Sequence, residues 1–325
     1  MSKNTVNKSA VAADWDRYWR GTWEASAHED GSPQDAALEG FWQQFFQAAG
    51  YRKSQGSLLD VACGNGAVIR YAQQFSSRAP QCFAFDYSHA ALLNLQSRYA
   101  NVCCTAGDGN KPPYVAASFD TVVSQFGIEY AGAGASAVAA VAPLVAPGGY
   151  LALVMHLHDG AIYKECADNY RALEDVKQLD ILELARSAFL AGFAINARTG
   201  SVAVFKQAER AFTPAVRGLE QLLQRWGPQV AGGLLQQLYR DIAEMYKNMS
   251  AYAEAEVIAW VDGMTVEIDA YAGRMLSMVN AAVDEPACDR LCQQLSAIGF
   301  TRLNRDKLRI GAKAEFAAWT LVAQR

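Results

Sequence analysis

The stretch at residues 58–68 constrains the fold more than any other part of the chain. Its apolar run carries an acid, Asp60, and leads through Ala62 into a turn whose glycines, Gly64 and Gly66, stand one residue apart before a helical pattern begins. This order predicts a buried parallel strand, a tight turn and a helix N-terminus. The glycines let the backbone approach a ligand, and the free N–H groups with the helix dipole suit an anionic or strongly polar one. We therefore expect an α/β sheet with a ligand site beside this turn.

The glycine spacing excludes two common nucleotide-binding motifs. A dinucleotide fingerprint needs a third glycine where Ile69 stands, and the phosphate loop G-x-x-x-x-G-K-S/T is absent. What remains is D-x-x-x-G-x-G, a pattern that an ordinary strand, turn and helix can also carry. Whether this pattern marks a ligand site or only an ordinary strand, turn and helix depends on the elements further along the chain.

Length and composition describe an ordinary globular protein. The chain has 325 residues, of which 51% are hydrophobic and 19% charged, enough for one large domain or two smaller ones. The net charge of −4 gives no basic surface for nucleic acid or anionic membrane, and no apolar run reaches membrane-spanning length. The seven cysteines, an odd number without zinc-site spacing, predict reduced thiols, a cytoplasmic location and no bound metal.

Strand-like and helix-like segments alternate along the first half of the chain. The expected strands lie at residues 58–61, 81–86, 101–105, 118–126 and 150–157, and the last part of the chain adds a helix at 291–298 and two antiparallel strands at 301–310 and 316–323. Strands that alternate with helices at this pitch predict βαβ units and a parallel sheet.

A long helical segment separates the two strand-bearing parts. Residues 161–289 have helical periodicity, although 200–205 could be either strand or helix, and a segment of this length predicts a helical cap rather than a loop. At the other end of the chain, the aromatic residues Tyr18 and Trp19 could fold over a ligand as a lid. The expected division is an N-terminal lid segment at 1–50, a sheet domain at 51–160 and 290–325, and a helical cap at 161–289.

Further motifs accompany the glycine turn. Asp86 ends the second strand, G-D-G at 107–109 follows the third, S-F-D at 118–120 opens the fourth, and L-V-A-P-G-G at 144–149 precedes the fifth. With these motifs the chain resembles a class I S-adenosylmethionine-dependent methyltransferase of the small-molecule type, strongly at 57–157 and weakly at 291–325. The resemblance implies a Rossmann-like, doubly wound, seven-stranded sheet that is parallel except for its last strand, and S-adenosylmethionine as the cofactor.

The resemblance also assigns residues to the cofactor site. The glycine turn would hold the methionine end, Asp86 would bind both ribose hydroxyls, and Asp108 would accept a hydrogen bond from the adenine amine. Tyr87 could pack on the adenine, and Gln125 would contribute mainly through its backbone. The full set of expected cofactor-binding residues is Tyr18, Trp19, Asp60, Ala62, Gly64, Gly66, Asp86, Tyr87, Asp108, Gly109, Gln125 and Phe126.

Two places could supply a general base. His156 and His158 end the fifth strand on the same side, and histidine suits proton removal near neutral pH. They could equally be two polar residues at a strand exit. Glu129 and Tyr130 follow the fourth strand, where related enzymes face their substrate, although a histidine is common where Tyr130 stands.

The substrate is the least determined part. Residues 241–289 contain ten acids and only two bases, Lys247 and Arg274, which fits either a solvated face or a pocket for a cationic amine. The aromatic residues that could add cation–π contacts there, or simply pack in a core, are Tyr246, Tyr252, Trp260 and Tyr271.

We expect methyl transfer to a nitrogen, oxygen or sulfur of a small metabolite, with an amine preferred and the cap selecting the substrate. No nucleic acid or membrane partner is expected, and the chain could form a homodimer. Two alternatives stay open. One is a methyl- or carboxymethyltransferase acting on tRNA, against which the missing basic surface argues. The other is a non-catalytic S-adenosylmethionine-binding partner protein that uses the cap as an interaction surface.

Overall fold

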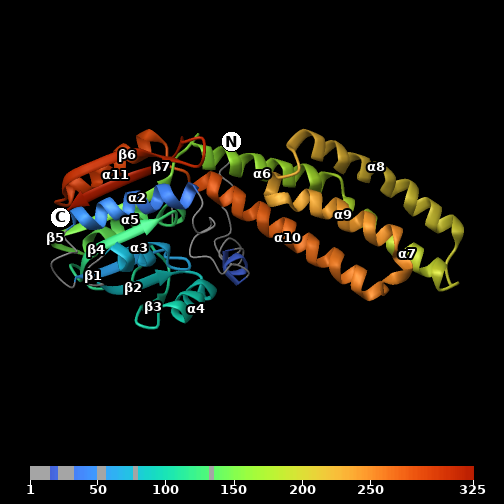
Figure 1. The fold of residues 1–325 in the computed structure, drawn as a ribbon, viewed down its shortest axis with the longest axis horizontal. Coiled ribbons are helices and arrows are strands. Elements are labelled where there is room, and N and C mark those ends of the chain that lie inside the picture. The colour runs from blue at the N-terminus through green and yellow to red at the C-terminus, as the bar shows by residue number, and fades with distance from the viewer. Residues whose placement is uncertain (1–14, 21–32, 50–55, 76–79, 132–134) are drawn as a thin grey trace. The chain divides into compact units, whose positions relative to one another are not determined.

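The chain forms two compact units (Figure 1). The computed structural model describes residues 15–20, 33–49, 56–75, 80–131 and 135–325. One unit consists of Met1–Lys164 and Ser277–Arg325, and the other of Glu165–Leu276. Of the expected lid segment at 1–50, only the helix at 15–20 and the segment at 33–49 fall within the described residues.

The first unit is built on a seven-stranded sheet with the order β3-β2-β1-β4-β5-β7-β6. The strands are β1 (Ser57–Val61), β2 (Gln81–Asp86), β3 (Cys103–Ala106), β4 (Phe119–Gln125), β5 (Val145–His156), β6 (Thr301–Ile310) and β7 (Glu315–Gln324). β1 to β5 pair in parallel, and β7 runs antiparallel to both β5 and β6. The expected doubly wound, mostly parallel sheet is confirmed, and its strand order reverses between β1 and β4, where such sheets bind ligands.

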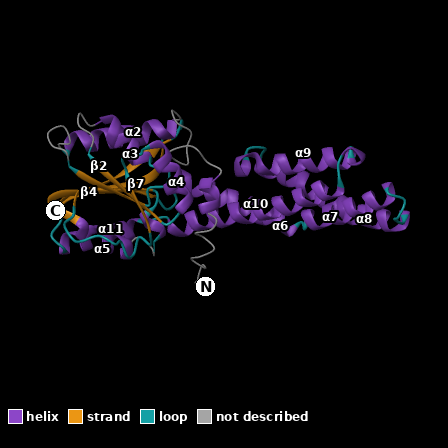
Figure 2. Ribbon diagram, turned by 90° about the horizontal axis from the view of Figure 1, so that it is seen from below, coloured by secondary structure: helices purple, strands orange, loops and turns teal. Residues whose placement is uncertain are grey.

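Helices cover both faces of this sheet. Figure 2 shows α2 (Pro33–Ala48) and α3 (Ala67–Phe75) on one face, and α5 (Ala135–Val141) and α11 (Glu285–Ala297) on the other. α4 (His89–Arg98) follows β2. The covering is apolar: Trp42 and Phe46 of α2 and Val141 of α5 are completely buried. α11 begins earlier than its expected start at residue 291, because Asp284 caps its first turn by accepting a hydrogen bond from Ala287 N at 2.7 Å.

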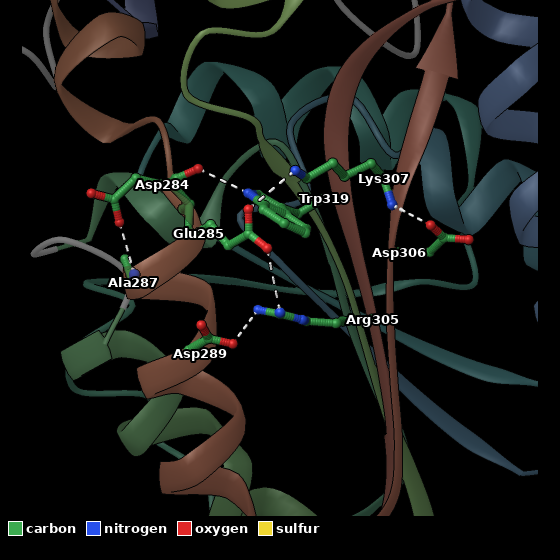
Figure 3. A network of polar contacts seen from close by, with 9 residues as sticks. Asp284, Glu285, Ala287, Asp289, Arg305, Asp306, Lys307 and Trp319 are labelled. Atoms are coloured by element: carbon green, nitrogen blue, oxygen red, sulfur yellow. Dashed lines mark hydrogen bonds and ion pairs between the residues drawn. The ribbon is translucent and has the colours of Figure 1, made fainter.

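A charged network ties the edge strand β6 to α11 (Figure 3). Arg305 of β6 pairs with Glu285 and Asp289 of the helix, and Lys307 Nζ lies 3.4 Å from Glu285 Oε2. Both basic side chains also lie over the Trp319 ring of β7. The network holds the C-terminal part of the chain on the sheet, and charged residues on an edge strand oppose pairing with a further strand.

The second unit is helical throughout its described length. Its helices are α6 (Ala161–Gln178), α7 (Ile181–Asn196), α8 (Val202–Trp226), α9 (Leu234–Lys247) and α10 (Glu254–Ala281), of which α6 and α10 also extend into the first unit. They share one apolar core that includes Phe189, Leu219 and Leu238. The undecided segment at 200–205 is helical from Val202 onward, because Ser201 caps α8. No described helix combines the length and apolarity needed to cross a bilayer.

The aromatic residues of the helical unit take part in its packing. Tyr246, Tyr252, Trp260 and Tyr271 all lie partly buried against the apolar core. Tyr246 also donates its hydroxyl to Glu209 at 2.8 Å, and burial together with this contact raises its pKa to about 12. Of the two explanations left open for these rings, the structure supports core packing.

Candidate active site

The turn after β1 is closely packed. Gly64 (φ +51°) and Gly66 (φ +90°) both lie in the left-handed region. A β-carbon on Gly64 would come within 2.8 Å of the Trp19 ring, and one on Gly66 within 2.9 Å of Leu95. Both positions therefore require glycine, for conformation and for space.

Two non-glycine residues at this edge of the sheet also have a strained backbone. Ala62 (φ +54°) follows β1, and Phe126 (φ +51°) follows the neighbouring strand β4. Gly127 packs on Ala62 so tightly that a β-carbon there would lie 2.4 Å from the alanine Cβ. Such conformations persist where the surroundings enforce them, and they gather at functional sites.

Asp60 is an acid buried within β1. Its side chain sits in β1 with 1% exposure, and among the described residues neither carboxyl oxygen has a hydrogen-bond partner. Burial, and then the neighbouring charge of Asp86, raises the pKa of Asp60 well above its ordinary value. An unpaired buried carboxylate is costly, so its presence indicates a ligand that donates hydrogen bonds or carries positive charge.

Asp86 links the ends of β1 and β2. Its Oδ2 accepts from Gly64 N at 2.8 Å and its Oδ1 from Ser88 N at 2.7 Å. Burial raises the pKa of Asp86, and these backbone hydrogen bonds oppose the rise. A carboxylate has further lone pairs, so both oxygens can still accept from a ligand. The next residue, Tyr87, is 61% exposed.

Asp108 and Gly109 follow β3 on the other side of β2. Asp108 Oδ1 accepts from both the backbone N and the Nδ2 of Asn110, each at 2.9 Å. A β-carbon on Gly109 would lie 3.4 Å from Ala131 Cβ. Asp108 therefore shapes a local turn at the same end of the sheet as Asp86.

The short helix at residues 15–20 lies against this edge of the sheet. Asp16 Oδ1 accepts from Ser88 Oγ at 2.9 Å and from Ala90 N at 3.0 Å, at the N-terminus of α4. The Trp19 carbonyl accepts from Asn94 Nδ2 at 2.6 Å, while its ring lies on the glycine turn. Tyr18, the other expected lid residue, contacts the Trp19 ring at 4.9 Å.

Glu129 and His156 form a buried pair at the ends of β4 and β5. Glu129 Oε1 lies 2.8 Å from His156 Nδ1 and also accepts from His156 N at 3.0 Å. The side chains are 0% and 5% exposed, respectively. The rings of Phe126 and Tyr130 flank the imidazole at 4.4 and 5.9 Å. Trp15 contacts Tyr130 in turn at 5.5 Å, so aromatic rings connect the helix at 15–20 to this pair.

The structure does not bring every expected residue into this cluster. His158 lies beyond the end of β5, exposed, with its Nδ1 3.1 Å from Asp159 and its ring beside Tyr163. Gln125 directs its side chain to α2, where its Oε1 accepts from Trp42 Nε1 at 2.6 Å.

Sequence reasoning missed four residues that build the site: Asp16, Ser88 as its partner, Asn94 and Gly127. Ser88 also caps α4, since its Oγ accepts from Ala91 N. The acid within the aromatic stretch W-D-R-Y-W was a usable signal for Asp16, because a carboxylate is a common partner for a helix N-terminus.

Residues 59–153 match the family model described as a methyltransferase domain. No curated protein sequence matches the chain significantly.

Three of the similar solved structures come from different organisms. An S-adenosylmethionine-dependent methyltransferase from Aquifex aeolicus is 17% identical, over 36% of this chain and 64% of that chain, with a TM-score of 0.32. One from Mesorhizobium loti is 20% identical, over 41% and 57%, with a TM-score of 0.33. A complex of a Haloferax volcanii methyltransferase activator with a putative methyltransferase is 18% identical, over 45% and 60%, with a TM-score of 0.34. The chain thus spans less than two thirds of the length of each.

The family match covers most of the part of the sheet that carries the site, and ends before His156. It runs from β1 through the glycine turn, Asp86, Asp108 and Glu129 into β5. Strand order and the glycine turn agree with the family model, and residues 59–153 of the sheet unit accordingly form a methyltransferase domain.

Proposed function

We propose that the chain transfers the methyl group of S-adenosylmethionine to a nitrogen, oxygen or sulfur of a small metabolite, with an amine preferred. The observation that carries this proposal is the buried carboxylate of Asp60 beside the glycine turn, which has no hydrogen-bond partner among the described residues. It lies where the strand order reverses, between β1 and β4. An anionic ligand, or one without hydrogen-bond donors, would leave that carboxylate without compensation.

The residues of the site fit the chemistry of this cofactor. Asp60 has free acceptors for the ammonium group of the methionine end, and the left-handed backbone of Gly64 and Gly66 forms the turn beside it. Asp86 would accept from the ribose hydroxyls with its remaining lone pairs, and Asp108 from the adenine amine. Bound there, the cofactor supplies a methyl group on a sulfonium that is already a good leaving group.

The remaining work for the protein is positioning and exclusion of water. Ala62, Phe126 and the Gln125 backbone lie at the carboxyl ends of β1 and β4 and would line the reacting side. The helix at 15–20, with Tyr18 and Trp19, would act as the lid that keeps water out. Tyr87, exposed at the end of β2, would pack on the adenine.

The helical unit would select the substrate. It leaves the sheet unit soon after β5, since α6 begins at Ala161, five positions beyond His156. Most of the acidic stretch at 241–289 lies in this unit, and it supports an amine substrate. Some of its carboxylates are already paired, such as Asp262 with Arg186 and Asp269 with Lys177. The amine preference therefore depends on the acids that remain.

Calorimetric titration with S-adenosylhomocysteine tests the cofactor site. We expect the parent to bind S-adenosylhomocysteine and Asp86→Ala to bind it at least about tenfold more weakly. A tenfold change corresponds to a loss of about 1.4 kcal/mol in the free energy of binding. Asp120→Ala is the matched control. The Asp120 carboxylate accepts a hydrogen bond from the backbone N–H of Ser57 in β1 at 2.8 Å. Ser57 lies at the opposite end of β1 from the glycine turn. No binding by the parent, or equal losses in the two variants, would contradict the assignment.

Turnover separates an enzyme from a partner protein that only binds. Labelled S-adenosylmethionine is incubated with the parent and with a metabolite extract, and transfer of the label is followed. An enzyme consumes the donor and labels a small molecule. Binding of S-adenosylhomocysteine without any consumption would exclude catalysis.

A further inference from the structure

The Glu129–His156 pair fixes which nitrogen of the imidazole is basic. A carboxylate can only accept hydrogen bonds, and Glu129 Oε1 faces His156 Nδ1 at 2.8 Å. The proton of the neutral imidazole therefore lies on Nδ1, and the lone pair lies on Nε2. The tautomer follows from this hydrogen-bond network. The same oxygen also holds the backbone N–H of His156, so Glu129 orients both the ring and the end of β5.

The surroundings of the pair suit proton transfer rather than simple packing. The imidazole is held between the rings of Phe126 and Tyr130, at the same sheet edge as the glycine turn. Among the described residues, the second carboxyl oxygen of Glu129, Oε2, is buried without a hydrogen-bond partner. That oxygen therefore keeps lone pairs with which it can accept a further hydrogen bond.

We infer that His156 takes the proton of the methyl acceptor, and that Glu129 is its positioning residue. This rests on the proposed methyl transfer and narrows the substrate to compounds with a removable hydrogen on the reacting atom, such as an amine or a hydroxyl. The acceptor's lone pair bonds to the methyl carbon while the carbon–sulfur bond breaks and its electron pair stays on sulfur. The acceptor's proton passes to His156 Nε2 and later to solvent, so no oxidant or reductant is needed.

The tautomer can be observed without turnover. Nitrogen–proton correlation spectra of the full chain with labelled histidine report which ring nitrogen is protonated, and His156→Gln assigns the signals. We expect the Nδ1–H form for the parent and loss of this preference in Glu129→Gln. His89→Gln, an exposed histidine at the start of α4, is the control and should leave the His156 signals unchanged. An Nε2–H tautomer in the parent would overturn the inference.

Turnover with chosen acceptors tests the proton transfer itself. The probes are labelled S-adenosylmethionine with primary amines, with phenols, and with pyridines, whose nitrogen has no hydrogen to lose. We expect amines or phenols to be methylated, and His156→Gln to lower kcat about a hundredfold or more, the usual contribution of a general base. KM and the affinity for S-adenosylhomocysteine should stay near the parent values. Glu129→Gln, which keeps the shape of the side chain, should lower kcat about tenfold and provides a second variant should His156→Gln unfold.

The outcomes distinguish this inference from the proposed function. A parent that neither binds S-adenosylhomocysteine nor consumes donor would overturn both. A parent that turns over while His156→Gln keeps the parental kcat would overturn only the role of His156. Methylation of pyridines alone would also overturn only the role of His156. An activity lost in His158→Gln but kept in His156→Gln would have the same consequence.

Discussion

The indole ring of Trp19 lies on Gly64 so closely that a β-carbon at that glycine would stand 2.8 Å from ring atom Cζ2. The helix at 15–20 and the turn after β1 are therefore packed as one surface, although they are more than 40 positions apart in the chain. Anything that enlarges residue 64 has to displace this helix.

Gly64→Ala should weaken both the fold and the site. The left-handed conformation at φ +51° costs an alanine about 1–2 kcal/mol, and the contact with Trp19 adds a steric penalty. We expect a lower free energy of unfolding in urea, changed tryptophan fluorescence, and weaker binding of S-adenosylhomocysteine.

Gly148→Ala separates the two causes. Gly148 also has a positive φ, +80°, but a β-carbon there would meet nothing within 4 Å. It should therefore show the conformational loss alone, with unchanged fluorescence and binding. Equal effects of the two substitutions would mean that the Trp19 contact has no role.

Asp60→Asn should stabilise the protein without cofactor while weakening the site. The pKa of Asp60 is raised in the folded state, so folding favours its protonated form. Stability therefore falls as pH rises from the unfolded value of about 3.9 through the raised folded value. An asparagine avoids this loss, and we expect a gain of about 0.5–2 kcal/mol near neutral pH, a common size for such replacements.

Urea unfolding of Asp60→Asn and the parent at pH 5 and pH 8 measures this effect. The advantage of the variant should grow toward pH 8, while its affinity for S-adenosylhomocysteine should fall at least about tenfold. The exposed Asp168 of α6 gives the control, because Asp168→Asn should change stability by less than about 0.5 kcal/mol at either pH. A variant less stable than the parent at pH 8 would show that Asp60 has a partner in the unliganded protein.

The sheet was predictable from sequence because its signals are local. Buried parallel strands appear in the sequence as apolar runs, and acidic or glycine residues lie at or near their ends, as Asp60, Gly64 and Asp86 do. The reversal of strand order and the antiparallel last strand then followed from the resemblance. Helix bounds were harder, because caps such as Asp284 lie outside the apolar pattern that marks a helix.

The details of the site depend on pairs that no local pattern records. Glu129 and His156 stand 27 positions apart, and their contact requires β4 and β5 to be neighbours in register. The sequence placed His156 and His158 on one face by strand alternation, but β5 ends at His156, so alternation no longer governs the residue two positions later. The spacing of the aromatic residues in the helical unit fits a packed core and a binding pocket equally well, so the sequence could not distinguish the two.

Asp16→Ala should release the helix at 15–20. Burial alone would raise the pKa of Asp16, but hydrogen bonds from Ala90, Ser88 and Arg20 outweigh it and lower the pKa overall. The stabilisation is therefore present above the unfolded value of about 3.9 and is lost as pH falls through the lowered folded value. Removing an acceptor at a helix N-terminus costs about 0.5–2 kcal/mol.

Stopped-flow tryptophan fluorescence with S-adenosylhomocysteine follows the release. We expect Asp16→Ala to speed dissociation of the ligand, because the helix at 15–20, our proposed lid, no longer docks on α4. Asp16→Asn keeps an acceptor oxygen but loses the charge, so it should fall between the alanine variant and the parent. Dissociation at the parental rate in Asp16→Ala would show that the helix does not gate the site.

Gln125→Ala should affect stability more than cofactor binding. The Gln125 side chain accepts from Trp42 Nε1 at 2.6 Å, so alanine leaves a buried indole N–H without its partner. Leaving such a donor unsatisfied costs about 1–3 kcal/mol. Because only the backbone of Gln125 faces the reacting side in our proposal, the affinity for S-adenosylhomocysteine should stay within about threefold of the parent.

Trp42→Phe removes the donor instead, and Trp42→Phe with Gln125→Ala should cost less than the two single losses added together. A large loss of affinity in Gln125→Ala at parental stability would instead place its side chain on the cofactor.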